Sequence, residues 1–321
     1  MNCFYVSYRR PLQKISACYY LSFPQLSIFS FLSFVFLIIA IIAPPNQLLA
    51  RSRSHHSYKG GIKDLSYEQV NSLVQASGVL LYDATSHKVL FARNEDVPYA
   101  PASTTKLMTA LVAYDKTAFK GSVRIKREDT LVQPSHVPLI AGEIVPVSQL
   151  VEELLIGSCN DAALALARYS SGSVEKFVEE MNQKAASLGC RNTHFVNPHG
   201  LFEPGQYTTA QDLMRIFQAA IKNPIINQIC QTKKIHFQNG GISRVMYNHN
   251  RLLGSYMGMG PAKTGWTRIS LHTYAASCER NGHTLYLTLL HSPDKWYDAR
   301  ILFDYGFSQT KPQYTTIEEK F

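Results

Sequence analysis

The sequence has little cysteine and lacks the spacings at which cysteine and histidine usually bind metals. Six cysteines occur in 321 residues, and no C-x-x-C or H-x-x-x-H pattern is present. A zinc site is therefore not predicted, and nothing in the sequence calls for another cofactor. Four cysteines follow residue 50 and allow three disulfide pairings, among which the sequence does not choose. They are Cys159, Cys190, Cys230 and Cys278.

A long basic block is also missing, although the formal net charge is +9. The first 50 residues carry three basic residues and no acidic one, which leaves 29 basic and 23 acidic residues in the remainder. Because this excess is spread along the chain, a nucleic-acid partner is not predicted. The excess fits a solvated basic surface or an acidic substrate.

No apolar run reaches the roughly 20 residues that a membrane-spanning helix needs. A 15-residue apolar run covers residues 29–43, follows basic residues and ends at Pro44-Pro45. Its length is typical of a secretory signal, with cleavage after Ala50. A leader of 50 residues is long for a signal peptide, so an uncleaved N-terminal membrane anchor through residues 29–43 is the alternative. Basic residues lie on both sides of the run, with Arg51 and Arg53 just after it, so the charge pattern does not settle the orientation of such an anchor.

Strand patterns near both ends of the chain enclose a helical block. They predict an α+β (mixed α/β) fold, with a mainly antiparallel sheet formed from both ends, helices on its faces and a mostly helical subdomain. The predicted strands cover residues 78–82, 88–93, 272–279 and 284–292, and the predicted helices cover residues 103–114, 209–222, 294–304 and 147–188, the last with breaks at 157–160 and 170–173.

The stretch PASTTKLMTAL places Ser103 three residues before Lys106 at the start of the first predicted helix. Residues three apart share a helix face, and a cation is mildly unfavourable at this end of a helix. A lysine held there as a neutral amine could take the proton of the serine hydroxyl. The pair is therefore a candidate nucleophile and base, although this spacing alone is common.

Two further motifs follow in the chain. In IGSCNDAALALA, Ser158 and Asn160 lie at a break between helical runs, where both side chains can face a cleft; Asp161 could cap the next helix. In GPAKTGWT, Lys263 and Thr264 suit a substrate carboxylate, and Gly265 lets a substrate backbone lie close.

Together, S-x-x-K, S-x-N and K-T-G form a signature of serine β-lactamases and penicillin-binding proteins. With FVNPHGLFEPGQYTTAQDL at 195–213 and NHNRLLG at 248–254, the chain resembles the low-molecular-weight penicillin-binding proteins, the D-alanyl-D-alanine carboxypeptidase family, from about residue 70 to 310. The resemblance implies a β-lactamase/transpeptidase-like fold and a serine-type D-Ala-D-Ala carboxypeptidase. It implies peptidoglycan stem peptides and β-lactam antibiotics as ligands, and the periplasm or the outer face of the bacterial cytoplasmic membrane as the location.

The resemblance also implies roles for individual residues. Ser103 would attack the carbonyl of the penultimate D-alanine and Lys106 would be the base, while Ser158 and Asn160 would relay protons and position the substrate amide. The substrate-binding residues would be Lys263, Thr264, Gly265 and Trp266, with Lys263 and Thr264 on the terminal carboxylate. The backbone N–H groups of Ser103 and Trp266 would form the oxyanion hole.

The sequence departs from the family pattern at Cys159, where relatives often have a smaller residue, and at Trp266, where histidine or another aromatic residue is frequent. It predicts a leader at 1–50, a linker at 51–65, a catalytic domain at 66–310 and a tail at 311–321, too short for the second domain and membrane helix of many relatives. The alternatives are a DD-endopeptidase that cuts cross-links, a β-lactamase, disfavoured because Glu203 is the only acid in VNPHGLFEPGQ, and an inactive wall-binding scaffold.

Overall fold

The computed structural model describes residues 65–239 and 242–310. Their main sheet has the strand order β2-β1-β9-β8-β7 and is antiparallel throughout. The central pairing joins the two ends of the described chain, with Gly78 opposite Leu290, as the sequence predicts. The strands are β1 (Gly78–Asp83), β2 (Lys88–Arg93), β7 (Met259–Thr267), β8 (Leu271–Arg280) and β9 (His283–Ser292).

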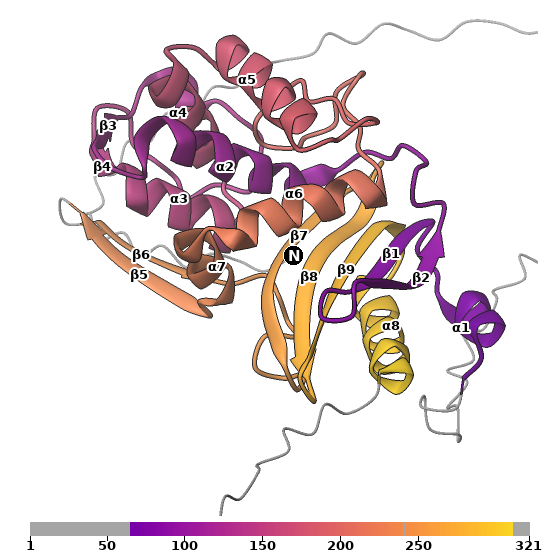
Figure 1. The fold of residues 1–321 in the computed structure, drawn as a ribbon. Coiled ribbons are helices and arrows are strands. Elements are labelled where there is room, and N and C mark those ends of the chain that lie inside the picture. The colour runs from indigo at the N-terminus through magenta and orange to yellow at the C-terminus, as the bar shows by residue number, and fades with distance from the viewer. Residues whose placement is uncertain (1–64, 240–241, 311–321) are drawn as a thin grey trace, which may run out of the picture. The chain divides into compact units, whose positions relative to one another are not determined.

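The sheet separates two hydrophobic cores because successive side chains of a strand point to opposite faces. On β1, Val79 and Leu81 face the core under helices α1 (Tyr67–Leu73) and α8 (Lys295–Gln309). Leu80, between them, faces the opposite core, beneath helix α6 (Ala210–Lys222). Figure 1 shows α8 against one face of the sheet, and α6 between the sheet and the helical block. The predicted helix-covered sheet is confirmed.

The helical block is built around α2 (Lys106–Thr117), which contacts α3, α4, α5 and α6. The other members are α3 (Val147–Ile156), α4 (Asn160–Ser171) and α5 (Val174–Ser187), and the breaks between them fall where the sequence predicts. Seven consecutive residues of α2, Leu107 to Ala113, are buried, so the helix is packed on all sides rather than along one amphipathic stripe. This packing holds in place the turn that precedes the helix.

Several short elements were not predicted. Helix α1 and helix α7 (Pro224–Gln231) are among them, although Asn223 caps α7 and Pro224 occupies its first turn, a recognisable start signal. The short pair β3 (Ser122–Arg124) and β4 (Ile144–Pro146) lies within residues 122–147, where the sequence predicts short β-like pieces between turns. A further two-stranded sheet, which was not predicted, pairs β5 (Lys234–Asn239) with β6 (Ile242–Tyr247). Val245 and Tyr247 of β6 are exposed, so the strand lacks the apolar alternation of a core strand.

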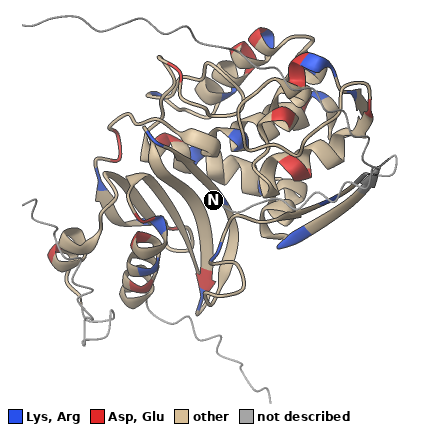
Figure 2. Ribbon diagram, turned by 180° about the vertical axis from the view of Figure 1, so that it is seen from behind, with Lys and Arg blue, Asp and Glu red and all other residues tan. Residues whose placement is uncertain are grey.

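The four cysteines of the described chain are buried and free, so no disulfide is formed among them. Basic and acidic residues are interspersed over the described elements (Figure 2). Across residues 65–239 and 242–310, no helix is both long and apolar enough to cross a bilayer. The expected leader at residues 1–50, most of the expected linker and the expected tail lie outside the described residues.

Candidate active site

Ser103 lies in a tight turn that precedes α2, rather than in the α-helix that the sequence predicts. Residues Ala102–Thr105 form a 3₁₀ turn and α2 begins at Lys106. The carbonyl of Pro101 accepts hydrogen bonds from Thr104 Oγ1 at 2.6 Å and from Thr273 Oγ1 of β8 at 2.8 Å. Ala102 adopts a left-handed conformation, φ 47°, a strained geometry that concentrates at functional sites. The turn is thus fixed against the sheet with Ser103 partly exposed.

Lys106 is fully buried and its side-chain nitrogen contacts three oxygens. Nζ lies 3.0 Å from Ser103 Oγ, 2.6 Å from Asn160 Oδ1 and 2.5 Å from the carbonyl oxygen of His199. Burial, followed by the positive charge of Lys263, lowers the pKa of Lys106 well below its ordinary value. These causes favour the neutral amine, which is the form a base needs.

The second motif lies between α3 and α4 and faces the same centre. Ser158 is left-handed, φ 57°, and only 5% exposed. Asn160 is the first residue of α4; its Oδ1 accepts from Lys106, while its Nδ2 donates to the carbonyl of Gln133 at 2.8 Å. Because both ends of the amide are engaged, its orientation is determined.

Asp161 does not cap α4 in the way the sequence suggests. Its carboxylate accepts the backbone N–H groups of Val137 and Leu139, at 3.1–3.2 Å, and that of the adjacent Ala162. The N-cap residue is Cys159, whose side chain makes no capping bond. Asp161 therefore binds the segment before β4 to the start of α4.

The third motif lies on the edge strand β7. Lys263 Nζ donates to Ser158 Oγ and to the carbonyl of Thr264, both at 2.9 Å. Burial lowers the pKa of Lys263 to about 8, and Lys295 adds to this decrease. A Cβ on Gly265 would lie 2.7 Å from the backbone nitrogen of Ser103, so glycine allows β7 to approach the serine turn. Trp266 is 59% exposed.

Sequence reasoning missed contributions from backbone groups, which carry no residue-specific signal. The carbonyl of His199 holds Lys106, and burial lowers the pKa of the His199 imidazole to about 3, so this side chain is neutral. Gly200 has φ 87°, and a Cβ there would lie 1.9 Å from the carbonyl oxygen of Ala102. Asn197 Oδ1 accepts the N–H of Gly200 at 2.8 Å. The NPHG stretch therefore supports the serine turn.

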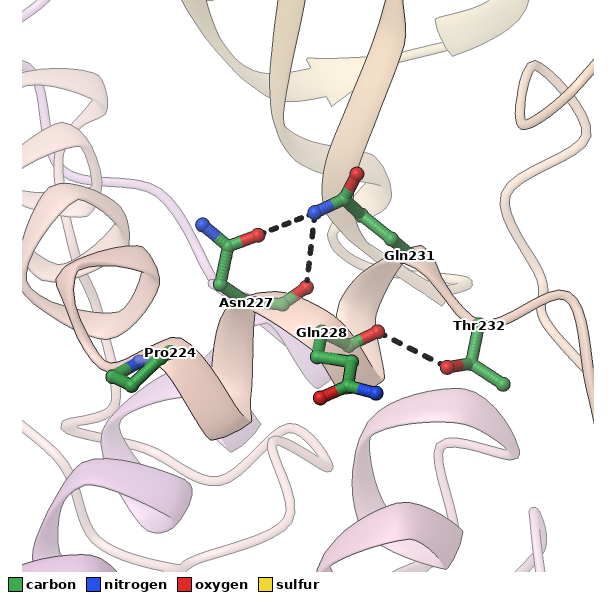
Figure 3. Close-up of a pocket in the computed structure, with 5 residues that line it drawn as sticks. All are labelled: Pro224, Asn227, Gln228, Gln231 and Thr232. Atoms are coloured by element: carbon green, nitrogen blue, oxygen red, sulfur yellow. Dashed lines mark hydrogen bonds between the residues drawn. The ribbon is translucent and has the colours of Figure 1, made fainter.

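A separate pocket lies on α7 and shares no residue with the three motifs. Figure 3 shows its lining residues, whose polar groups mostly bond to one another: Gln231 Nε2 donates to Asn227 Oδ1, and Thr232 Oγ1 donates to the carbonyl of Gln228. Because these groups satisfy each other, the pocket is not the candidate site. Over the part of the chain that the structure describes, no cluster of three His, Cys, Asp or Glu side chains could hold a metal ion.

The fold and the three convergent motifs define the class of serine penicillin-binding enzymes, in which a sheet and a helical block meet at a Ser–Lys pair. A family profile described as D-alanyl-D-alanine carboxypeptidase matches residues 66–293. The chain belongs to the D-alanyl-D-alanine carboxypeptidase family, whose members are cell-wall peptidases and therefore hydrolases.

Known relatives agree with this assignment. The D-alanyl-D-alanine carboxypeptidase DacB2 of Mycobacterium tuberculosis is 35% identical over 237 residues, which cover 71% of this chain and 81% of that protein. DacA of Escherichia coli is 35% identical over 64% of this chain and 53% of its own length.

Solved structures show the same fold. A D-alanyl-D-alanine carboxypeptidase from Mycobacterium tuberculosis superposes with a TM-score of 0.70 at 34% identity, covering 75% of this chain and 93% of that one. The Streptomyces K15 DD-transpeptidase gives 0.69 at 31% identity, covering 73% and 98%. The predicted fold class and family are confirmed.

Proposed function

We propose that Ser103 is the nucleophile with which this enzyme removes the terminal D-alanine from peptidoglycan stem pentapeptides, through an acyl-enzyme that penicillin also forms. The observation that carries the proposal is the contact set of Lys106. Two of its three neighbours, Asn160 Oδ1 and the His199 carbonyl, can only accept hydrogen bonds. A neutral amine has two N–H groups, which these oxygens occupy, so its lone pair faces Ser103 Oγ.

In this arrangement Ser103 donates its proton to Lys106 as its oxygen attacks the carbonyl of the penultimate residue. Such general-base assistance contributes roughly 10²–10⁴-fold to a rate. The negative charge that develops on the carbonyl oxygen would be held by the backbone N–H groups of Ser103 and Trp266, on the two sides of the close approach at Gly265. Donors of this kind contribute about 3–4 kcal/mol each.

Lys263 and Ser158 would complete the proton path and the carboxylate site. Because Ser158 Oγ accepts a hydrogen bond from Lys263, its own proton is free to be donated to the leaving amine, and the proton that Lys106 took from Ser103 would then replace it. The charged Lys263 has three N–H groups, and Ser158 and the carbonyl of Thr264 engage two of them. The third, with the Thr264 hydroxyl, would bind the terminal carboxylate. Water then hydrolyses the ester on Ser103.

A β-lactamase would also need a carboxylate that activates water for rapid deacylation. Glu203, the acid of the corresponding stretch, accepts a hydrogen bond from Asn197 Nδ2 at 3.0 Å and so helps to hold the NPHG turn. This structural role supports slow deacylation of penicillin.

We also propose that residues 1–50 direct export, with residues 29–43 acting as a cleaved signal or as a membrane anchor, and that residues 66–310 form the catalytic domain.

The proposed reaction is tested by mass spectrometry after incubation with two substrates, a pentapeptide ending in D-Ala-D-Ala and a cross-linked muropeptide dimer. We expect the pentapeptide to lose one alanine faster than the dimer is cut. Cleavage of the dimer alone would replace the carboxypeptidase by an endopeptidase that uses the same residues. Cleavage of neither substrate would favour a wall-binding scaffold.

The charge of Lys263 predicts how substrate binding depends on pH. The lysine is charged below its pKa of about 8 and loses its proton as the pH rises through that value. KM for the pentapeptide should therefore be constant from pH 6 to 7 and rise about tenfold for each pH unit above the transition. A pentapeptide amide, which lacks the carboxylate, is the control and should not show this rise. A KM for the free acid that stays constant to pH 9.5 would contradict the assignment of Lys263.

A further inference from the structure

The segment between β3 and β4 is hydrogen-bonded to the start of α4. Its carbonyl groups engage Asn160, since Gln133 accepts from Asn160 Nδ2 and Ser135 accepts from the backbone N–H of Asn160, both at 2.8 Å. Asp161 accepts from two further N–H groups of the same segment, at Val137 and Leu139. The position of this segment therefore determines which way the Asn160 amide points.

A residue from the outlying β5–β6 hairpin holds this segment from the other side. Arg244 of β6 is 6% exposed, and its Nη2 donates to both carboxylate oxygens of Glu143, at 2.9 and 3.1 Å, and to the carbonyl of Pro138 at 3.3 Å. Glu143 also accepts the N–H of Ile140 at 2.8 Å. One guanidinium nitrogen thus joins the hairpin to the segment between Pro138 and Glu143.

A second acid lies close enough to this ion pair to feel the charge of Arg244, but its hydrogen bond is made to another residue. Glu153 of α3 is fully buried, and burial raises the pKa of its carboxyl to about 8, so that it is mostly neutral at pH 7. Its hydrogen bond comes from Gln149 Nε2 at 2.9 Å rather than from the arginine. Glu143 is therefore the ionic partner of Arg244 at neutral pH.

We infer that Arg244 is a positioning residue for the acylation of Ser103, a role that rests on the proposed function of Lys106 and Asn160. The chain of contacts runs from Arg244 to the segment 133–143, from that segment to the Asn160 amide, and from Asn160 Oδ1 to Lys106 Nζ. If the segment shifts, the amide loses its partner at Gln133 and no longer fixes the amine. Small displacements of a catalytic group can cost about 10²-fold in rate.

The experiment measures acylation by penicillin under single-turnover conditions, from pH 5 to 9, for the full chain and its variants. We expect Arg244→Met to lower the second-order acylation rate about tenfold and to move the acid limb of the pH profile, which reports on Lys106. Arg244→Lys should be acylated at a rate within about threefold of the wild type, because one guanidinium nitrogen makes the contacts to Glu143 and Pro138 and an ammonium can replace it. Glu153→Gln is the matched control and should acylate normally.

Loss of stability is separated from loss of positioning by a double variant. Arg244→Met alone leaves Glu143 unpaired and partly buried, which lowers the melting temperature. Glu143→Gln/Arg244→Met removes that charge, so the melting temperature should recover while acylation remains slow. Acylation that recovers with the melting temperature, or an Arg244→Met variant with an unchanged pH profile, would overturn the inference. A wild type that is not acylated at Ser103 would instead overturn the proposed function.

Discussion

Replacing Lys106 with methionine is expected to lower the rate of acylation of Ser103 by roughly 10³-fold without unfolding the protein, in the range that general-base assistance supplies. Methionine keeps most of the volume of the side chain but cannot accept the serine proton. It also removes a buried amine, so the stability lost with the contacts to Asn160 and His199 is offset by the desolvation that is avoided.

The measurement for this variant is the time course of the penicillin adduct by intact mass, together with the melting temperature. Lys116→Met is the control on the same helix, because Lys116 pairs with Glu180 at 2.7 Å on the surface and has no role at the site. Acylation of Lys106→Met at more than a tenth of the wild-type rate would show that another group takes the proton.

Replacing Gly200 with alanine is expected to destabilise the fold by about 3 kcal/mol or more and to abolish acylation. The left-handed backbone costs a non-glycine residue about 1–2 kcal/mol, and the new Cβ would stand 1.9 Å from the carbonyl oxygen of Ala102. Relief of such a contact requires backbone movement, which costs roughly 1–3 kcal/mol more. The backbone that must move is the turn that presents Ser103.

Gly172→Ala separates these two contributions. Gly172 has a similar φ of 85°, but a Cβ there would meet no atom within 4 Å. This variant should lose only the backbone contribution and keep full acylation. Denaturant unfolding and penicillin labelling of both variants measure the difference. Equal stabilities for the two variants would show that a side chain at residue 200 does not displace the turn that presents Ser103.

The sequence predicted the elements that depend on local residue patterns. Strands β1, β8 and β9 are largely buried and apolar, and the breaks around α4 contain glycine and serine. Three short motifs with distinctive chemistry indicated Ser103, Lys106 and Lys263. These residues belong to different elements, and the structure brings them together through Asn160 and Ser158.

The parts that could not be predicted depend on tertiary contacts. Ser103 lies in a 3₁₀ turn because Pro101 and Ala102 are fixed against β8, a contact between residues 172 positions apart. The His199 carbonyl is a backbone group that any residue could provide. Arg244 lies in a hairpin with exposed apolar side chains, and its partner Glu143 is 101 residues away. No local pattern reports such pairs.

The central claim is that Ser103 becomes acylated, and it is tested most directly by digesting the penicillin-treated full chain and sequencing the modified peptide by tandem mass spectrometry. The account predicts a single penicilloyl group on Ser103 and no adduct in Ser103→Ala. An adduct on Ser158, on another nucleophile, or one that persists in Ser103→Ala would contradict it.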